Sequence, residues 1–302
     1  MAALATLLAL AGSAAAAAAP PAKKTNVILF VIDDLGWADL AFEGFPPAME
    51  RTAGGHAEYS TPHLDRLARE GVLLDRYYVN QLCSPTRTSL VSSRYAYNLG
   101  LAGGVITNGH AVALRLNESS IGQHFQALGH RTHAFGKWDV GMTTKYHTPT
   151  YRGFDTFVGY YNADEDYLTH HCGGCGCAAG LDLHDDRAGS LQLLQDNSTY
   201  STILYTKAII DEISKAPTCP GGIAGTAPFF LYAAYQAVHG PLEAPQRFID
   251  ECTREGVAPE SGGGNRNIFC GMGKILISRW ILISRFACTR GADLTSVGSQ
   301  GA

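Results

Sequence analysis

Two adjacent carboxylates and a short cysteine motif are the residues whose types and spacing first indicate chemistry in this sequence. Asp33 and Asp34 directly follow the apolar run Asn26–Ile32. Paired carboxylates supply oxygen ligands to hard divalent cations such as Ca²⁺ or Mg²⁺, although an acidic pair at a strand end also forms turns or caps helices. The motif Cys-x-Pro-x-Arg begins at Cys83 and places Arg87 one helical turn further on.

The proline of this motif predicts a helix that begins beside Cys83. The positive end of that helix is expected to lower the pKa of the thiol and to favour a bound anion, and Arg87 would neutralise an oxyanion. The alternative is a half-cystine next to a surface arginine. Lys137 and His239 are further candidates, because each lies at or just after the end of an apolar segment.

Apolar and β-branched segments predict the strands that position these residues. The expected strands are Asn26–Ile32, Val72–Val79, Thr132–Lys137 and Pro228–Ala234. Capping residues and helical spacing predict helices between them, at 62–70, Pro85–Arg94, Ile121–Leu128 and Tyr200–Lys215. This alternation implies an α/β fold with a mostly parallel central sheet flanked by helices.

Each candidate residue is expected at or beyond the carboxyl end of one of these strands. Ligands bind at that edge in an open α/β sheet, because the parallel strands all deliver their following loops there. One such position would carry little weight, but four strands would bring carboxylates, a sulfur, an amine and an imidazole together. We therefore expect a functional site at this edge, formed by Asp33, Asp34, Cys83, Lys137 and His239.

The composition is that of a globular protein of the secretory pathway. The 302 residues are 46% hydrophobic and 17% charged, which excludes a disordered or collagen-like chain. The formal net charge of −4, without a basic stripe, argues against nucleic acid as a partner. Residues 1–19 are apolar or small and predict a secretory signal peptide, and the sequons at Asn117 and Asn197 agree with it. No other apolar run has the length of a membrane span, and most of the eight cysteines are expected to pair.

The motif CSPTR at Cys83–Arg87 resembles the signature of the sulfatase family, in which the cysteine is oxidised to Cα-formylglycine. Further segments resemble the same family in the same order, from NVILFVIDDLGWADL and TPHLDRLAREGVLLDRYY to GKWDVG, RGFDTFVGY and FFLYAAYQAVHGPLEAP. The pattern is most similar to the arylsulfatase B-like branch, within the alkaline-phosphatase-like superfamily. The resemblance extends over Asn26–Met272.

The resemblance implies a sulfuric ester hydrolase with formylglycine, made from Cys83 by a formylglycine-generating enzyme, as its nucleophile. It implies that Asp33, Asp34 and residue 83 bind Ca²⁺, with Mg²⁺ as the alternative, and that Arg87 stabilises the formylglycine alkoxide. The implied sulfate contacts come from Lys137 and His239, which also take part in catalysis. The implied substrate is a sulfate ester of a sugar or glycosaminoglycan, and the implied location is lysosomal or extracellular.

Two departures from the family pattern accompany the resemblance. Asp139 stands where the family usually has histidine and is a candidate substrate-binding residue. It would act as an orienting acceptor for formylglycine or Lys137, or else mark a branch of the family that uses aspartate. The Asp-Asn segment that completes the family's metal site does not follow Met272, which predicts a truncated sulfatase with weak or no activity. The expected organisation is a signal peptide at 1–19, the amino-terminal part of the catalytic domain at 25–272 and a divergent tail at 273–302. The repeat ILISRW-ILISRF in this tail is strongly β-favouring and predicts an edge hairpin or strand.

Alternatives to a sulfatase activity remain open on the same residues. A phosphodiesterase or phosphonate hydrolase of the same superfamily would use the same site, and a non-catalytic remnant would bind sulfated glycans without turnover. The segment Glu165–His170 is expected near the substrate entrance by resemblance. His170 and His171 are candidate substrate contacts there, with ordinary surface histidines as the alternative. The aromatic residues Tyr160, Tyr161 and Tyr167 would stack on a sugar or else pack the loop.

Overall fold

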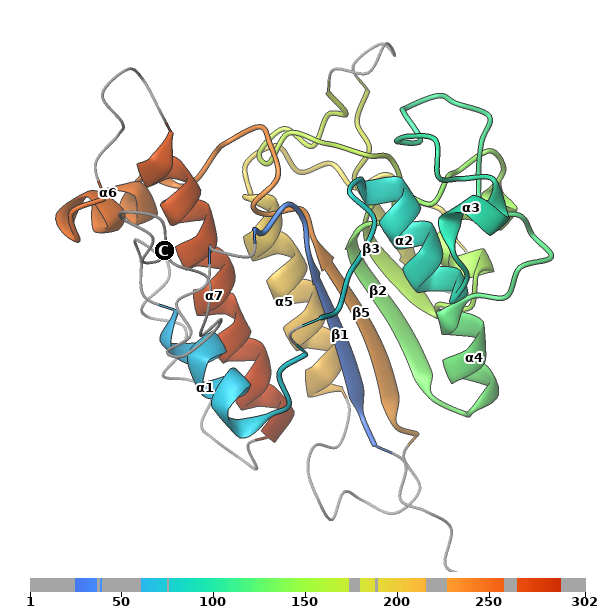
Figure 1. Ribbon diagram of the computed structural model, residues 1–302, viewed down its shortest axis with the longest axis horizontal. Coiled ribbons are helices and arrows are strands. Elements are labelled where there is room, and N and C mark those ends of the chain that lie inside the picture. The colour runs from blue at the N-terminus through green and yellow to red at the C-terminus, as the bar shows by residue number, and fades with distance from the viewer. Residues whose placement is uncertain are drawn as a thin grey trace, which may run out of the picture.

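The computed structural model describes residues 25–36, 39, 61–74, 76–173, 180–187, 190–215, 227–257 and 265–288. A five-stranded sheet lies at its centre, with helices packed on both faces (Figure 1). The strand order is β1-β5-β2-β3-β4, in which all neighbours are parallel except β4, which is antiparallel to β3. The strands are β1 (Val27–Ile32), β2 (Arg131–Lys137), β3 (Thr156–Tyr160), β4 (His184–Arg187) and β5 (Phe229–Tyr235). The predicted α/β fold with a mostly parallel, helix-flanked sheet is confirmed.

The helices cover the sheet in two groups. One face carries α5 and α7, and the other carries α2, α3 and α4 (Figure 1). Two short 3₁₀ turns, Lys145–His147 and Pro149–Tyr151, precede β3. The α-helices are α1 (Pro62–Glu70), α2 (Cys83–Ser92), α3 (Ala96–Leu99), α4 (Ile121–Ala127), α5 (Ser201–Ser214), α6 (Gln246–Arg254) and α7 (Arg266–Cys288).

Residue types at the helix ends explain several of these bounds. Helix α1 follows Thr61, has Pro62 in its first turn and ends before Gly71, as the sequence predicts. At α4, the Ser120 side chain accepts a hydrogen bond from the backbone N–H of Gln123 at 3.1 Å. The Gln123 side chain in turn accepts from the backbone N–H of Ser120 at 2.8 Å, which completes a capping box.

The core consists of two layers that meet at β5. Alternate side chains from Leu231 to Tyr235 pack toward α5, and those from Phe230 to Ala234 pack toward α2 and α4. Every residue of β5 is buried, which is the pattern of a central parallel strand. The strand that leads into the segment carrying His239 is therefore held on both faces.

Two strand predictions near the sheet edge need correction. The predicted strand Val72–Val79 does not pair with any described strand, and Val72 and Tyr78 are 88% and 86% exposed. Strand β1 is the edge of the described sheet and is half-buried along its length, whereas the sequence predicted burial on both faces. The two segments line a common apolar cavity of about 590 Å³ instead of forming a ladder. Without a paired neighbour, apolar β-branched composition alone does not produce a strand.

The predicted edge hairpin at the ILISRW-ILISRF repeat is also wrong, because the repeat lies in the long helix α7. Met272, Ile275 and Leu276 are at most 1% exposed and follow one another at helical spacing in the core. Tertiary packing thus overrides local β propensity. Helix α7 continues across the predicted boundary after residue 272, and the predicted signal peptide and residues 289–302 lie outside the described residues. No described helix meets the length and hydropathy of a membrane span.

Candidate active site

The predicted site residues converge at the carboxyl edge of the sheet. Asp33 follows β1 and Lys137 ends β2, while Cys83 and Arg87 lie in the first half of α2. The strand order β1-β5-β2 brings these elements together although Asp33 and Lys137 are 104 residues apart in sequence. His239 lies in the turn of residues 236–241 that follows β5, hereafter the 236–241 turn.

A buried ion network forms the centre of the site. The Lys137 Nζ donates to Asp33 Oδ2 at 2.6 Å, and Arg87 Nη2 lies 3.1 Å from Asp33 Oδ1. The two cationic side chains are 0% and 1% exposed, and that of Asp33 is 8% exposed. Burial alone would raise the pKa of Asp33, but the charges of Arg87 and Lys137 outweigh it and lower the pKa. Asp33 is therefore an ionised counter-ion between two interior cations.

Asp139 joins this network to the start of α2. Its Oδ1 accepts from the Ser84 hydroxyl at 2.6 Å, and its Oδ2 lies 3.8 Å from Lys137 Nζ. Burial raises the pKa of Asp139 despite the opposing charges of Lys137 and Arg87 and the hydrogen bonds from Ser84 and Cys83. The residue thus contacts position 83 as an acceptor.

Cys83 is the first residue of α2 and has a partly exposed, free thiol. Burial raises its pKa to about 11, with further contributions from Asp139 and Asp33 that Lys137 only partly opposes. The expectation of a lowered pKa is therefore wrong, because desolvation and two neighbouring carboxylates raise it. An unmodified thiol here stays protonated near neutral pH and is a weak nucleophile and a weak metal ligand.

Asp34 and His239 occupy the outer, more accessible part of the site. The Asp34 side chain is 66% exposed, and its Oδ2 lies 3.6 Å from Nε2 of His239, whose side chain is 29% exposed. The backbone N–H of Val238 donates to the Asp33 carbonyl at 2.9 Å and ties the 236–241 turn to the end of β1. This turn contains cis peptide bonds at Ala237–Val238 and Gly240–Pro241. The structure thus brings His239 beside the predicted carboxylate pair.

The described donor set does not by itself fit a calcium ion. Both carboxylate oxygens of Asp33 already contact cationic nitrogens, at 3.1 and 2.6 Å. Within the described ranges, no group of three or more His, Cys, Asp or Glu side chains has a metal-binding arrangement. Calcium sites usually supply about 6–8 oxygen ligands, so Asp33 and Asp34 are an incomplete set.

The sequence analysis missed one carboxylate of the site, Asp164. Burial raises its pKa, and the charges of Lys137 and His239 act in the opposite direction, which places it within the field of both residues. Its Oδ1 atom is buried and has no hydrogen-bond partner. The run of three acidic residues, Asp164 to Asp166, soon after β3 was the available sequence signal.

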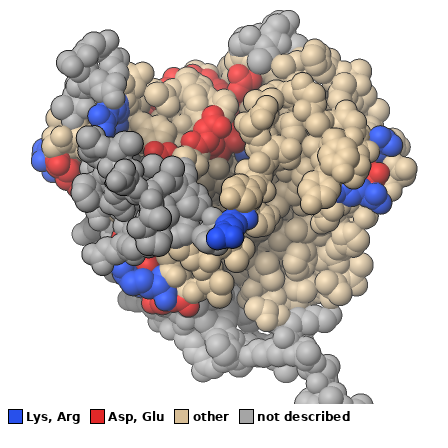
Figure 2. Space-filling model, viewed as in Figure 1, with Lys and Arg blue, Asp and Glu red and all other residues tan. Residues whose placement is uncertain are grey.

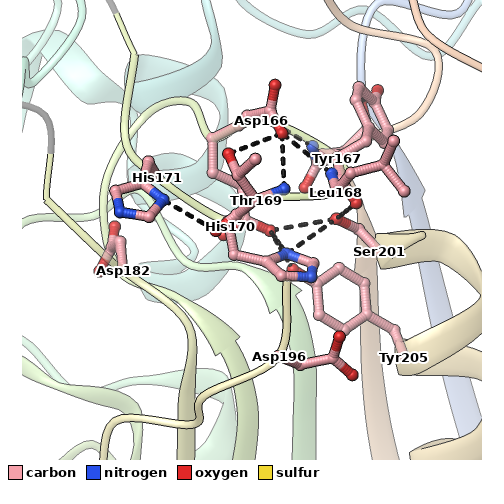
Figure 3. Close-up of polar contacts among 12 residues, drawn as sticks. Asp166, Tyr167, Leu168, Thr169, His170, His171, Asp182, Asp196, Ser201 and Tyr205 are labelled. Carbon is pink, nitrogen blue, oxygen red and sulfur yellow. Dashed lines mark hydrogen bonds and ion pairs between the residues drawn. The ribbon is translucent and has the colours of Figure 1, made fainter. Parts of the chain in front are cut away.

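Tyr167 and His170 of the predicted entrance segment are buried, and so are Tyr160 and Tyr161, which precede it. Tyr160, Tyr161 and Tyr167 are 1%, 3% and 0% exposed, so they pack the structure and do not offer a surface for stacking on a sugar. His170 is also 0% exposed and contacts Ser201 and the Thr199 carbonyl (Figure 3). The packing alternative from the sequence is therefore the correct one for the three tyrosines. The surface position expected for the two histidines is wrong for His170, whereas His171 is exposed.

The surface over the carboxyl edge is acidic, whereas the cations of the site are interior. Figure 2 shows Asp and Glu side chains gathered in the upper middle of this face, where Figure 1 places the carboxyl end of β1. Lys137 and Arg87 lie beneath this surface with at most 1% exposure. Cys83 and His239, by contrast, are partly exposed.

Comparison with curated proteins identifies relatives of one family. The profile of the Sulfatase family matches residues 25–264. The chain is 35% identical over 228 residues to arylsulfatase J of Mus musculus, which covers 75% of this chain and 34% of that protein. It is 28% identical over 271 residues to N-acetylgalactosamine-6-sulfatase of Homo sapiens, covering 83% of this chain and 46% of that protein.

Solved structures share the fold. The crystal structure of Ps i-CgsB in complex with k-i-k-neocarrahexaose matches with a TM-score of 0.69 and 24% identity, over 87% of this chain and 55% of that one. The PsFucS1 sulfatase from Pseudoalteromonas sp. matches with a TM-score of 0.63 and 20% identity, over 87% and 52% of the two chains. The chain therefore spans about a third to just over half of the length of these relatives. Because the family profile covers most of its length, the chain belongs to the sulfatase family.

Proposed function

We propose that this chain carries the nucleophile half of a sulfuric ester hydrolase site and acts on a sulfated carbohydrate. The observation that carries the proposal is the position of residue 83 at the first turn of α2, in contact with Asp139 and beside two buried cations. Family membership supports the reaction class. Arylsulfatase J and N-acetylgalactosamine-6-sulfatase among the relatives support a sulfate ester, and the latter name supports a sugar.

Formylglycine at position 83, made by a formylglycine-generating enzyme, would supply a hydrated aldehyde that displaces the alcohol from sulfur and afterwards releases sulfate. The raised pKa of the unmodified thiol supports a need for this modification, because the thiol itself is a poor nucleophile. Arg87 would stabilise negative charge on the oxygen at position 83, and Asp139 would orient that group as an acceptor. The residues present therefore fit this modification.

Lys137 and His239 would handle the sulfate group and the leaving alcohol. The Lys137 ammonium would bind a sulfate oxygen as a point charge, shared with Asp33. The His239 imidazole, partly exposed beside Asp34, would contact sulfate and hold the proton that passes to the departing alcohol oxygen. Both side chains come from the carboxyl edge of the sheet, which supports a single binding site.

We assign no step to a divalent cation, because both carboxylate oxygens of Asp33 already contact cationic nitrogens. Ca²⁺, or alternatively Mg²⁺, would take Asp33, Asp34 and residue 83 as ligands, but this set offers fewer oxygens than such ions require. That shortfall favours a second candidate function, in which the chain binds sulfated glycans without turnover. A phosphodiesterase or phosphonate hydrolase activity would use the same residues, and the experiment described below tests it as the third possibility.

The secretory route is part of the proposal. Asn117 and Asn197, the acceptors of the two sequons, are both exposed, so glycans would be accommodated at either position. Cys252 and Cys270 form a disulfide between α6 and α7, which suits an oxidising compartment. We propose a lysosomal or extracellular location on these grounds.

Mass spectrometry and turnover assays together test the proposed function. The chain is expressed through a secretory pathway, and the peptide containing residue 83 is examined for formylglycine. Hydrolysis of p-nitrophenyl sulfate is then compared with hydrolysis of bis-p-nitrophenyl phosphate and with the variant Cys83→Ala. Formylglycine with turnover of the sulfate ester that Cys83→Ala abolishes supports the hydrolase. Phosphate-ester turnover alone favours the phosphodiesterase, and sulfated-glycan binding without turnover favours the binding function.

A further inference from the structure

A buried polar network anchors the loop of residues 165–170, hereafter the 165–170 loop, to α5. Tyr205 donates to Glu165 Oε1 at 2.5 Å, and Ser201 donates to the same oxygen at 3.3 Å. His170 Nδ1 lies 3.5 Å from this oxygen, and its Nε2 lies 3.1 Å from the Thr199 carbonyl. Figure 3 shows Ser201 and Tyr205 of α5 facing His170 of the loop. All four side chains in this network are at most 1% exposed, so the network fixes the loop and is closed to a substrate.

Tyr167 projects from this anchored loop toward the residues around His239. Its ring is 0% exposed and stacks on Tyr200 at a centroid distance of 4.9 Å and an interplanar angle of 11°. Its hydroxyl lies 2.7 Å from the His239 carbonyl and 3.1 Å from the Gln236 carbonyl, and is the donor to both. One side chain thus bridges the two ends of the backbone segment that presents His239.

Among the residues that the structure describes, few polar contacts fix the place of the His239 ring. Its Nδ1 contacts the Gly240 carbonyl at 2.7 Å, and its Nε2 lies 3.6 Å from Asp34, which is largely exposed. The backbone is better held: the His239 N–H donates to the Gln236 carbonyl at 2.9 Å, and Val238 is tied to Asp33. The position of the imidazole therefore depends mainly on the backbone contacts of the 236–241 turn.

We propose that Tyr167 is a positioning residue for His239, and that the Glu165–His170 network holds Tyr167 for this task. The inference rests on the proposed function, in that His239 contacts sulfate. Tyr167 touches neither sulfate nor residue 83. Its hydroxyl sets the backbone from which the imidazole reaches the site, and a small displacement of a catalytic group is enough to lower a rate.

Tyr200 provides a matched control within the same pair of rings. It forms the other half of the stack, is 3% exposed, and donates from its hydroxyl to the Glu243 carbonyl at 2.7 Å. Tyr167→Phe and Tyr200→Phe each remove one buried hydroxyl that donates to a backbone carbonyl and keep the stacked ring. A purely structural role predicts the same effect for both variants, whereas positioning predicts an effect at His239 for Tyr167→Phe alone.

The test compares the two variants by NMR and by kinetics. The ring ¹H–¹³C signal of His239 is assigned by its loss in His239→Asn and is followed during titration with inorganic sulfate. In Tyr167→Phe we expect this signal to move before sulfate is added. We also expect sulfate affinity, and kcat for p-nitrophenyl sulfate where the wild type turns over, to fall by about five-fold or more. In Tyr200→Phe we expect the signal to stay in place and both quantities to stay within about two-fold.

The outcomes separate this inference from the proposed function. If sulfate does not shift the His239 signal of the wild-type chain, the proposed sulfate contact is overturned. The spectra recorded without sulfate still decide whether Tyr167 positions the His239 ring. Equal His239 spectra and equal sulfate affinities in the two variants overturn the positioning role. Melting temperatures that fall equally in both variants, with a changed His239 signal in Tyr167→Phe alone, support it.

Discussion

Replacing Asp33 with asparagine tests the central feature of the site, a carboxylate that neutralises two buried cations. Asp34→Asn is the matched control, because it changes the neighbouring residue, also a predicted metal ligand, whose side chain is 66% exposed. We expect Asp33→Asn to destabilise the fold strongly and Asp34→Asn to change the free energy of unfolding by less than about 0.5 kcal/mol. Both are measured by urea unfolding in the presence of a chelator.

The expected magnitude follows from the contacts of Asp33. Its two oxygens lie 3.1 Å from Arg87 and 2.6 Å from Lys137, and these cations are at most 1% exposed. Removing one partner of a buried ion pair costs about 3–5 kcal/mol, because the remaining charge stays buried without compensation. With a urea m-value of about 3 kcal/mol/M, that cost lowers the unfolding midpoint by about 1–1.7 M.

The pH dependence of this difference has a definite sign. In the folded state burial would raise the pKa of Asp33, but Arg87 and Lys137 outweigh burial and the pKa is lowered. Such a group contributes stability above its unfolded pKa of about 3.9 and loses it as the pH falls through the folded value. The gap between wild type and Asp33→Asn is therefore expected in full at about pH 6–7 and to shrink below about pH 4. Equal midpoints for Asp33→Asn and Asp34→Asn near neutral pH would refute the reasoning.

Three further predictions concern the Cys83 thiol, the disulfide and the predicted metal ligands. Burial raises the pKa of unmodified Cys83 to about 11, so its thiol is expected to react slowly with iodoacetamide near pH 7. The rate is expected to rise about tenfold with each pH unit up to the pKa, and a rate that levels off near pH 8–9 would contradict this. Cys252→Ser is expected to lower the free energy of unfolding by about 3 kcal/mol, because the disulfide with Cys270 closes a loop with a sequence separation of 18; an unchanged guanidinium midpoint under non-reducing conditions would count against it. Addition of about 1 mM Ca²⁺ to the chelator-treated chain is expected to stabilise the fold by less than about 0.5 kcal/mol in thermal melts. The reason is that Asp33 already contacts two cations, which leaves only Asp34 of the predicted pair to bind the ion. A larger increase in stability would show that the ligand set is complete.

The sequence predicted those parts of the fold in which local pattern and tertiary environment agree. Strand β2 and helix α1 have the residue types that their positions require, and the observed bounds differ from the predicted ones by at most one residue. The predicted strand Val72–Val79 failed because a strand needs a paired neighbour, which composition does not report. The continuation of helix α7 through the repeat was missed for the opposite reason, since the burial of Ile275 and Leu276 outweighs a β-favouring repeat.

The convergence of the site was predictable, but its electrostatics were not. The rule that loops at the carboxyl ends of parallel strands share one edge is enough to bring Asp33, Lys137 and His239 together. Cys83 reaches the same edge at the start of α2, without the strand that the sequence predicted before it. The rule does not report which oxygen faces which cation, and so Asp33 was predicted as a metal ligand alone. The helix-end argument gave the wrong direction for the pKa of Cys83, because desolvation and neighbouring charges depend on side chains distant in sequence, such as Asp139.

Fold stability and the proposed anion binding depend on the same two cations. Lys137 and Arg87 are stable in the interior because Asp33 faces both of them. A sulfate group that approaches Lys137 must share it with that carboxylate, so each increment of stability from the ion network weakens the attraction left for the anion. In the proposed function, the partial exposure of Cys83 and His239, next to a fully buried Lys137, would give the ester access from one side while the other side of the ammonium stays bound to Asp33. Such a site would hold its cations in place before substrate arrives, at the expense of affinity for free sulfate.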